Sequence, residues 1–225
     1  MSVDLPQNNS RTVLIGSTGS GKTQFGMWFL STRDYRYRPW FILDYKGERS
    51  FIELESKGAI DLDLSYTELP TDAGIYIIRV LPNQEELVSR FFKDCYYQEN
   101  VGIFIDEGTM VPKNDTWLRA CLTQGRSKEI ELIICTQRPV WLDKYVFTEA
   151  SYFGIFRLNS IDDRKIISNY LGGVEPNSLA PYHALWYMVN RQDFVIFEPV
   201  PSMKEIISSF NFVEIANTEN GVKVI

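Results

Sequence analysis

The chain has 225 residues, of which 44% are apolar, and a formal net charge of −6. This length supports one well-buried core, so we expect a single domain over residues 1–225, and the acidic balance confines any nucleic-acid contact to a local basic patch. Three scattered cysteines and one histidine argue against a disulfide framework and a zinc site, and no apolar run approaches the ~20 residues of a membrane span.

The first predicted elements enclose a glycine-rich loop. Residues 11–15 read R-T-V-L-I, a largely apolar and β-branched run that predicts a buried strand, and residues 24–31 predict a helix. Between them stands G-S-T-G-S-G-K-T, in the strand–loop–helix context of a phosphate-binding loop. Glycines let successive backbone N–H groups turn inward, and the helix N-terminus adds partial positive charge. We therefore expect this loop to bind a nucleotide through Gly16, Ser17, Thr18, Gly19, Ser20, Gly21, Lys22 and Thr23.

Two side chains of this loop have specific expected roles. In phosphate-binding loops of this kind, the lysine, here Lys22, reaches the β- and γ-phosphates. The hydroxyl of Thr23 is placed to bind a Mg²⁺ ion. The loop therefore predicts ATP and Mg²⁺ as cofactors.

Strands and helices alternate through the core, which we place at about residues 10–160. This alternation predicts an α/β fold with a mostly parallel central sheet flanked by helices. The sequence Asn83-x-x-Glu86 resembles a capping box and predicts the start of a helix that runs to about Glu99. A further helix is expected over 116–124, and the expected later strands are 40–44, 75–80, 101–105, 132–136 and 152–158.

The C-terminal part of the chain has a different pattern. Residues 184–189 and 194–197 predict an antiparallel hairpin, because a short polar connection joins them. We place this hairpin and a following short helix at about 180–212, and a polar tail at 213–225.

An acidic pair follows the strand expected at 101–105. Asp106 and Glu107 would lie at the carboxyl edge of a parallel sheet, where such sheets bind ligands. Asp106 is suited to hold Mg²⁺, mostly through its water shell, and Glu107 to orient or deprotonate an attacking water. Such a pair alone is more often a charge cluster at a helix N-terminus, but together with the loop it predicts ATP hydrolysis.

A neutral amide follows the strand expected at 132–136. If that strand lies beside the strand at 11–15, Gln137 points towards the γ-phosphate, where it can sense the phosphate and hold the water. The alternative is a polar strand end followed by a proline turn at Pro139.

Two stretches resemble the HerA–FtsK superfamily. Residues 125–139, G-R-S-K-E-I-E-L-I-I-C-T-Q-R-P, resemble the segment of FtsK-type DNA translocases that carries their sensor glutamine. Residues 43–48, L-D-Y-K-G-E, resemble the Asp-x-Lys-Gly-Glu segment common in that superfamily. The resemblance implies a RecA-like (ASCE) P-loop NTPase core that acts as a homo-oligomeric ring, usually a hexamer, and drives double-stranded DNA through its centre.

The size of the chain narrows the resemblance to one branch. The loop begins at residue 16 and fewer than ninety residues follow Gln137, so we expect neither an N-terminal membrane segment nor a nuclease domain. A motor of this size resembles the genome-packaging ATPases of membrane-containing icosahedral viruses such as tectivirus PRD1. This resemblance implies an ATPase that packages double-stranded viral DNA into a preformed capsid, with portal or vertex proteins as partners. It would act in the host cell cytoplasm during assembly and at the packaging vertex of the virion.

A ring ATPase normally receives an arginine from the neighbouring subunit at its γ-phosphate. The candidates for this arginine finger are Arg126, in the stretch that resembles FtsK, and Arg79, near the end of a strand. Either residue could instead form a surface ion pair.

Contacts to DNA are expected from a few lysine and arginine side chains that bind phosphates without reading bases. Lys113, in the loop after the acidic pair, is one candidate. A second is the run of Arg33, Arg36 and Arg38 interleaved with two tyrosines, although a solvated or intersubunit face is favoured for it.

Four other functions share parts of this pattern. A small-molecule kinase would leave Gln137 without a role, and a GTPase would need an Asn-Lys-x-Asp segment that we do not find. An assembly ATPase of filamentous phages, of the Zot type, usually carries a membrane span. A vertex or assembly factor that binds ATP without processive translocation also remains open.

Overall fold

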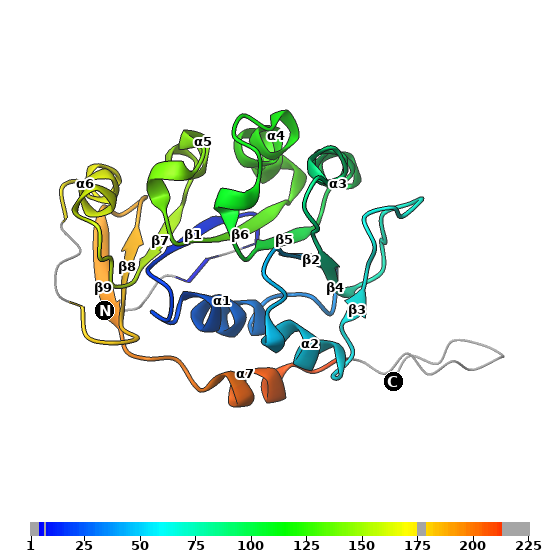
Figure 1. Cartoon of the computed structure of the whole chain (residues 1–225), viewed down its shortest axis with the longest axis horizontal. Coiled ribbons are helices and arrows are strands. Elements are labelled where there is room, and N and C mark those ends of the chain that lie inside the picture. Colours follow the sequence, from blue (N-terminus) through cyan, green and yellow to red (C-terminus); the bar gives the residue numbers. More distant parts are fainter. Residues whose placement is uncertain (1–4, 7, 175–178, 213–225) are drawn as a thin grey trace.

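The computed structural model of the chain describes residues 5–6, 8–174 and 179–212 (Figure 1). Within them, one sheet contains nine strands in the order β3-β4-β2-β5-β6-β1-β7-β8-β9. The strands are β1 (Arg11–Ile15), β2 (Pro39–Asp44), β3 (Ile60–Asp61), β4 (Gly74–Arg79), β5 (Gly102–Ile105), β6 (Glu131–Thr136), β7 (Tyr152–Ile155), β8 (Ala184–Met188) and β9 (Asp193–Phe197).

Helices cover both faces of the sheet, as Figure 1 shows. One layer contains α3 (Glu85–Gln98), α4 (Thr116–Gln124), α5 (Lys144–Thr148) and α6 (Ile161–Tyr170). The other layer contains α1 (Lys22–Ser31), α2 (Arg49–Glu55) and α7 (Met203–Ser209). Three short 3₁₀ turns are η1 (Gly108–Met110), η2 (Gly125–Lys128) and η3 (Pro139–Trp141). None of the helices in the described ranges has both the length and the apolar character needed to cross a bilayer.

In the order of the sheet, all strands from β3 across to β7 are parallel to one another. β8 pairs antiparallel with β7, and β9 pairs antiparallel with β8. The predicted mostly parallel sheet and C-terminal hairpin are therefore confirmed. The predicted tail at 213–225 lies outside the described residues.

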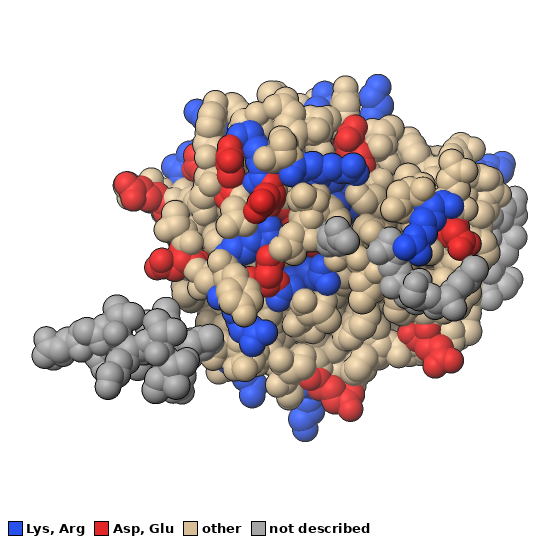
Figure 2. Space-filling view, turned by 180° about the vertical axis from the view of Figure 1, so that it is seen from behind, with Lys and Arg blue, Asp and Glu red and all other residues tan. Residues whose placement is uncertain are grey.

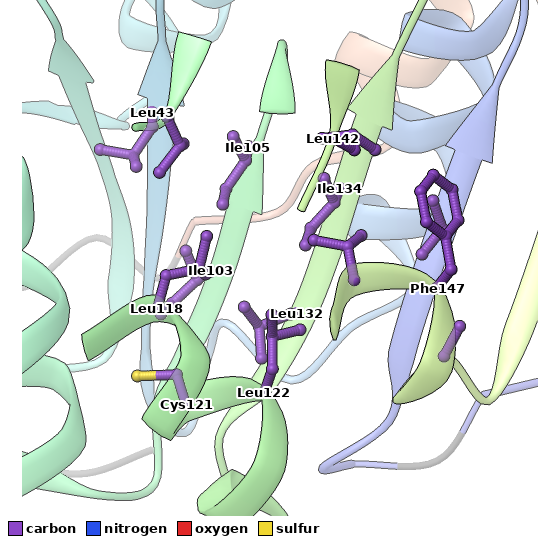
Figure 3. Packing of buried hydrophobic residues seen from close by; sticks show 14 of the residues in the cluster. Leu43, Ile103, Ile105, Leu118, Cys121, Leu122, Leu132, Ile134, Leu142 and Phe147 are labelled. Carbon is purple, nitrogen blue, oxygen red and sulfur yellow. The ribbon is translucent and has the colours of Figure 1, made fainter. Parts of the chain in front are cut away.

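The central strands are apolar on both sides because each side is covered by helices. In β5, Ile103 and Ile105 belong to the core cluster under α3 and α4, whereas Phe104 belongs to the cluster on the α1 side. Figure 3 shows the first of these clusters, in which Ile103 lies near Leu118 of α4 and Ile105 lies further along β5. A period-two strand buried on both faces reads as a continuous apolar run, which is why 101–105 was recognisable in the sequence.

The predicted capping box at Asn83 is wrong. Helix α3 begins at Glu85 with Gln84 as its N-cap, and no side-chain hydrogen bond caps it. Asn83 has φ of +67°, in the left-handed region, whereas an N-cap needs extended backbone. The carboxylates of Glu85 and Glu86 lie in the first turn, where they interact favourably with the helix dipole.

Candidate functional site

Three central strands bring the predicted motifs to one edge of the sheet. β6 lies between β5 and β1, and all three strands are parallel, so their carboxyl ends meet at the same edge. The phosphate loop follows β1, the acidic pair follows β5, and Gln137 follows β6. The condition set for Gln137, that the strand before it lies beside the strand before the loop, is therefore met by the pairing of β6 with β1.

The phosphate loop is held in place by backbone hydrogen bonds to its neighbouring strands. The amide of Gly16 donates to the Thr136 carbonyl at 3.1 Å, and that of Ser17 donates to the Arg157 carbonyl at 3.1 Å. Gly16 needs to be glycine, because a Cβ there would lie 2.6 Å from the Cβ of Phe156, which cannot rotate away. Gly21, with φ of +99°, leads directly into α1, so the loop ends at a helix N-terminus.

The loop keeps polar groups available for a phosphate. The hydroxyl oxygen of Ser20 is buried and has no hydrogen-bond partner among the described residues. Lys22 is 4% exposed, and burial lowers the pKa of its ammonium group despite nearby carboxylates. A buried cation beside an unpartnered hydroxyl fits a bound anion, because both groups would gain an interaction that the protein does not supply.

The two predicted metal-binding residues touch each other. The Thr23 hydroxyl donates to Asp106 Oδ1 at 3.0 Å, while the second oxygen, Oδ2, is buried without a hydrogen bond. Burial raises the pKa of Asp106, although the charge of Lys46 opposes the increase. A hydroxyl and an incompletely satisfied carboxylate form the oxygen donor set that Mg²⁺ favours, so these residues fit the predicted ion.

Glu107 lies beside Asp106 and is engaged at both carboxylate oxygens. Oε1 accepts the Thr109 hydroxyl at 2.8 Å and the Gln137 backbone N–H at 3.4 Å. Oε2 lies 3.0 Å from Nζ of Lys46. Burial alone would raise the pKa of Glu107, but the hydrogen bonds from Thr109 and Lys46 outweigh it and lower the pKa, so the group is ionised at neutral pH.

Gln137 reaches the phosphate loop directly. Its Oε1 accepts the hydroxyl of Thr18 at 2.5 Å, and its backbone N–H is the group that contacts Glu107. One residue therefore touches both the loop and the acidic pair. The sensing role of Gln137 stays a prediction, because it concerns a contact to the γ-phosphate.

Three residues near the site were not predicted as functional. Lys46 lies between the two carboxylates, and the only sequence signal for it was the D-Y-K-G-E stretch. Tyr182 lies against the loop, since a Cβ on Gly21 would lie 3.0 Å from the tyrosine ring. Arg157 follows β7 at the same edge with an exposed side chain. Neither Tyr182 nor Arg157 belongs to a recognisable motif, so only the fold reveals them.

The two candidate arginine fingers lie at opposite ends of the strands, Arg79 at the carboxyl ends and Arg126 at the amino ends. Arg79 ends β4 on the nucleotide edge, where it pairs with Asp61 and, at 2.6 Å, with Glu55. Arg126 lies in η2, before β6, on the far edge, and donates to the Ser151 hydroxyl at 3.0 Å. There it lines an open pocket of about 460 Å³.

The arginines at 33 and 38 do not form a DNA-binding face. Arg38 is 2% exposed and pairs with Glu131 at 2.7 Å and with Asp34 at 2.8 Å. Arg33 lies 3.5 Å from the same glutamate. The predicted contact to DNA is therefore wrong for Arg33 and Arg38, because the fully buried carboxylate of Glu131 holds both side chains. Of the three arginines, Arg36 is the exposed one.

On the face seen from behind, which Figure 2 shows, basic and acidic side chains are mixed rather than segregated. Lys113, the other predicted DNA contact, is exposed in the loop between η1 and α4. On that face, phosphate contacts would come from a few separate cations rather than from one large basic patch.

Comparisons with known proteins give one close relative in sequence. DNA packaging ATPase P9 of Enterobacteria phage PRD1 is 32% identical over 222 residues, which cover 94% of this chain and 96% of that protein. No protein-family model matches the chain.

Solved structures share the fold at lower identity. The genome packaging NTPase B204 of Sulfolobus turreted icosahedral virus 2, in complex with ATP-gammaS, has a TM-score of 0.71 and 20% identity over 87% of this chain and 100% of that chain. VirB4 of Thermoanaerobacter pseudethanolicus has a TM-score of 0.64 and 11% identity over 87% of this chain and 90% of that chain. At these identities, the likeness establishes the fold.

Proposed function

The chain belongs to the family of viral DNA-packaging ATPases that includes P9 of phage PRD1, and from this membership we propose that it hydrolyses ATP to drive double-stranded genomic DNA into a preformed capsid. The observation that carries the proposal is the meeting of the phosphate loop, the acidic pair and Gln137 at one sheet edge. That arrangement supplies anion binding, a carboxylate base and a sensor in one place.

The phosphates of ATP would be held by the loop from Gly16 to Thr23. Its N–H groups and Lys22 bind the phosphate oxygens, and Ser20 offers the hydroxyl that has no partner within the described chain. Thr23 and Asp106 would hold Mg²⁺, which when bound neutralises charge on the phosphates. The ring of Tyr182 beside Gly21 lies where it can flank the bound nucleotide.

Hydrolysis would depend on Glu107 and Gln137. Glu107 is ionised and fixed by Thr109, Lys46 and the Gln137 backbone, so it can accept a proton from an attacking water. The side chain of Gln137 can exchange its hydrogen bond with Thr18 for one to the γ-phosphate. Loss of that phosphate would return Gln137 to the loop and signal that hydrolysis has occurred.

A ring of subunits would complete the site with an arginine in trans. In a cyclic ring, each subunit contacts its neighbours through two different surfaces. Arg126 lies on the edge opposite its own nucleotide, so a head-to-tail ring can present it to the next subunit's γ-phosphate. Arg79 lies on the same edge as its own nucleotide and pairs within the chain, which makes it the weaker candidate. By analogy with other motors of this superfamily, the ring is proposed to be a hexamer.

DNA would pass through the centre of this ring, contacted at its phosphates by exposed lysines such as Lys113. Viral portal or vertex proteins would hold the ring at the packaging vertex during assembly in the host cytoplasm.

The test is ATP hydrolysis by the purified chain at low salt, with and without linear duplex DNA. We expect turnover that DNA stimulates and that Lys22→Ala abolishes. If DNA did not change the rate of ATP hydrolysis, the isolated chain would not be a DNA translocase, and translocation would require the other proteins of the vertex. Binding of ATP without turnover would contradict the proposal and favour an assembly factor that uses ATP only as a structural switch.

A further inference from the structure

The loop after β2 is built to fix the position of Lys46. The buried carboxylate of Asp44, 2% exposed, accepts the backbone N–H groups of Lys46 at 3.1 Å, Gly47 at 2.9 Å and Glu48 at 3.2 Å. Gly47 has φ of +68°, a backbone conformation that residues other than glycine rarely adopt. One aspartate and one glycine therefore close this loop tightly around the two residues between them, of which Lys46 is the second.

The ammonium group of Lys46 reaches both carboxylates of the acidic pair. Nζ lies 3.0 Å from Glu107 Oε2 and 3.5 Å from Asp106 Oδ2, and its side chain is 26% exposed. β2 lies next to β5, so this contact joins two adjacent strand ends. Without a cation here, two neighbouring buried carboxylates would repel each other and turn apart.

The contacts of Glu107 show what Lys46 does there. A carboxylate offers about four acceptor positions, and Thr109, the Gln137 backbone N–H and Lys46 occupy three of them. Lys46 is the only one of these three that holds Oε2, so its loss would leave that oxygen free to rotate. The remaining acceptor position is the one available to an attacking water.

We propose that Lys46 is a positioning residue that acts through Glu107, holding Oε2 so that the one free acceptor position points at the attacking water. This inference rests on the proposed ATPase function. It differs from the role of Lys22, which binds phosphate. Lys46 therefore affects the chemical step and leaves nucleotide binding almost unchanged.

The experiment measures single-turnover ATP hydrolysis and the Kd for a fluorescent ATP analogue, mant-ATP. The variants are Lys46→Met, Lys46→Gln and Lys46→Arg, with Arg49→Met as a matched control. Arg49 follows in the same segment, but its side chain is 91% exposed and pairs only with Glu53 among the described residues. Wild type and Lys22→Ala are measured beside them.

Lys46→Met and Lys46→Gln are each expected to lower the single-turnover rate by roughly 100-fold, as the loss of an aligned base does, with the Kd for mant-ATP within about threefold of wild type. Lys46→Arg is expected to recover most of the rate, because a guanidinium can also bridge the two carboxylates. Placed on Glu107→Gln, Lys46→Met should cost no further rate. Loss of mant-ATP binding, a wild-type rate, or an additional full loss on Glu107→Gln would each overturn the proposal.

A second measurement does not depend on activity. The melting temperatures of Lys46→Met, Glu107→Gln and the double variant, each without nucleotide, form a thermodynamic cycle. We expect the shift in melting temperature of the double variant to differ from the sum of the two single shifts, because each single variant already removes the same Lys46–Glu107 contact. Additive shifts would overturn the proposed contact between Lys46 and Glu107. If the wild-type chain showed no turnover, the proposed ATPase function would be overturned, and the melting-temperature cycle would still test the Lys46 contact.

Discussion

Thr23 donates its hydroxyl hydrogen to Asp106 Oδ1 at 3.0 Å, although 83 positions separate the two residues in the chain. The contact links the start of α1 to the end of β5 and so joins the phosphate loop to the acidic pair.

Replacing Lys22 with alanine should abolish ATP binding, because this buried ammonium faces the place where phosphate charge would lie. Equilibrium binding of mant-ATP checks the loss. Lys57→Ala, at an exposed position, serves as the control and should bind as wild type does. Unchanged binding by Lys22→Ala would remove this lysine from the phosphate site.

Glu107→Gln should lower the hydrolysis rate by roughly 100-fold or more but keep ATP bound, since an amide keeps the size of the side chain and cannot accept the proton from water. Quench-flow measurement of phosphate release, beside mant-ATP binding, separates the two effects. The exposed Glu68→Gln should leave both unchanged. If Glu107→Gln also lost nucleotide binding, the carboxylate would be a binding group rather than the base.

Gln137→Ala should lower the hydrolysis rate by roughly 100-fold while ATP binding stays near wild type, because one polar group at the γ-phosphate is lost. Thr18→Val tests the partner in the nucleotide-free state, since it removes only the hydrogen bond that Gln137 accepts. We expect Thr18→Val to retain most of the turnover. An equal loss in both variants would mean that the Thr18 contact itself, and not a contact to phosphate, is what matters.

Arg126→Ala should lose turnover alone and regain it when mixed with Glu107→Gln subunits, because a mixed ring contains interfaces with both groups intact. Steady-state ATPase assays over a range of mixing ratios measure this recovery. Arg79→Ala, tested in the same way, should retain turnover because its ion pairs lie within its own subunit. Recovery with Arg79→Ala instead would assign the finger to that residue.

Glu131→Ala should destabilise the chain by about 3–5 kcal/mol, since it leaves the buried guanidinium of Arg38 with Asp34 as its remaining carboxylate partner. Chemical denaturation monitored by tryptophan fluorescence measures the change. Arg36→Ala, at the exposed position of the same segment, should stay within about 0.5 kcal/mol of wild type. A similar stability for Glu131→Ala would show that the buried ion pair adds nothing to the fold.

Much of the site was recognisable in the sequence because its groups lie in short contiguous stretches. The phosphate loop needs glycines, a lysine and a threonine at fixed spacing, and the acidic pair directly follows an apolar strand. Both signals depend on local chemistry, so they remain visible without the fold. The capping box at Asn83 failed because a short polar pattern does not specify whether the backbone is extended or left-handed.

The alternation of strands and helices, the phosphate loop, the acidic pair and the candidate sensor can be predicted from the amino-acid order, because each is a pattern of neighbouring residues. The tertiary fold, in contrast, sets which strands are neighbours and so which strand ends lie together. It placed Lys46 between the two carboxylates, buried Arg38 against Glu131, and set Arg126 and Arg79 on opposite edges. These relationships arise from packing between residues far apart in the chain. The sequence around an arginine therefore does not show whether its side chain will be buried or exposed.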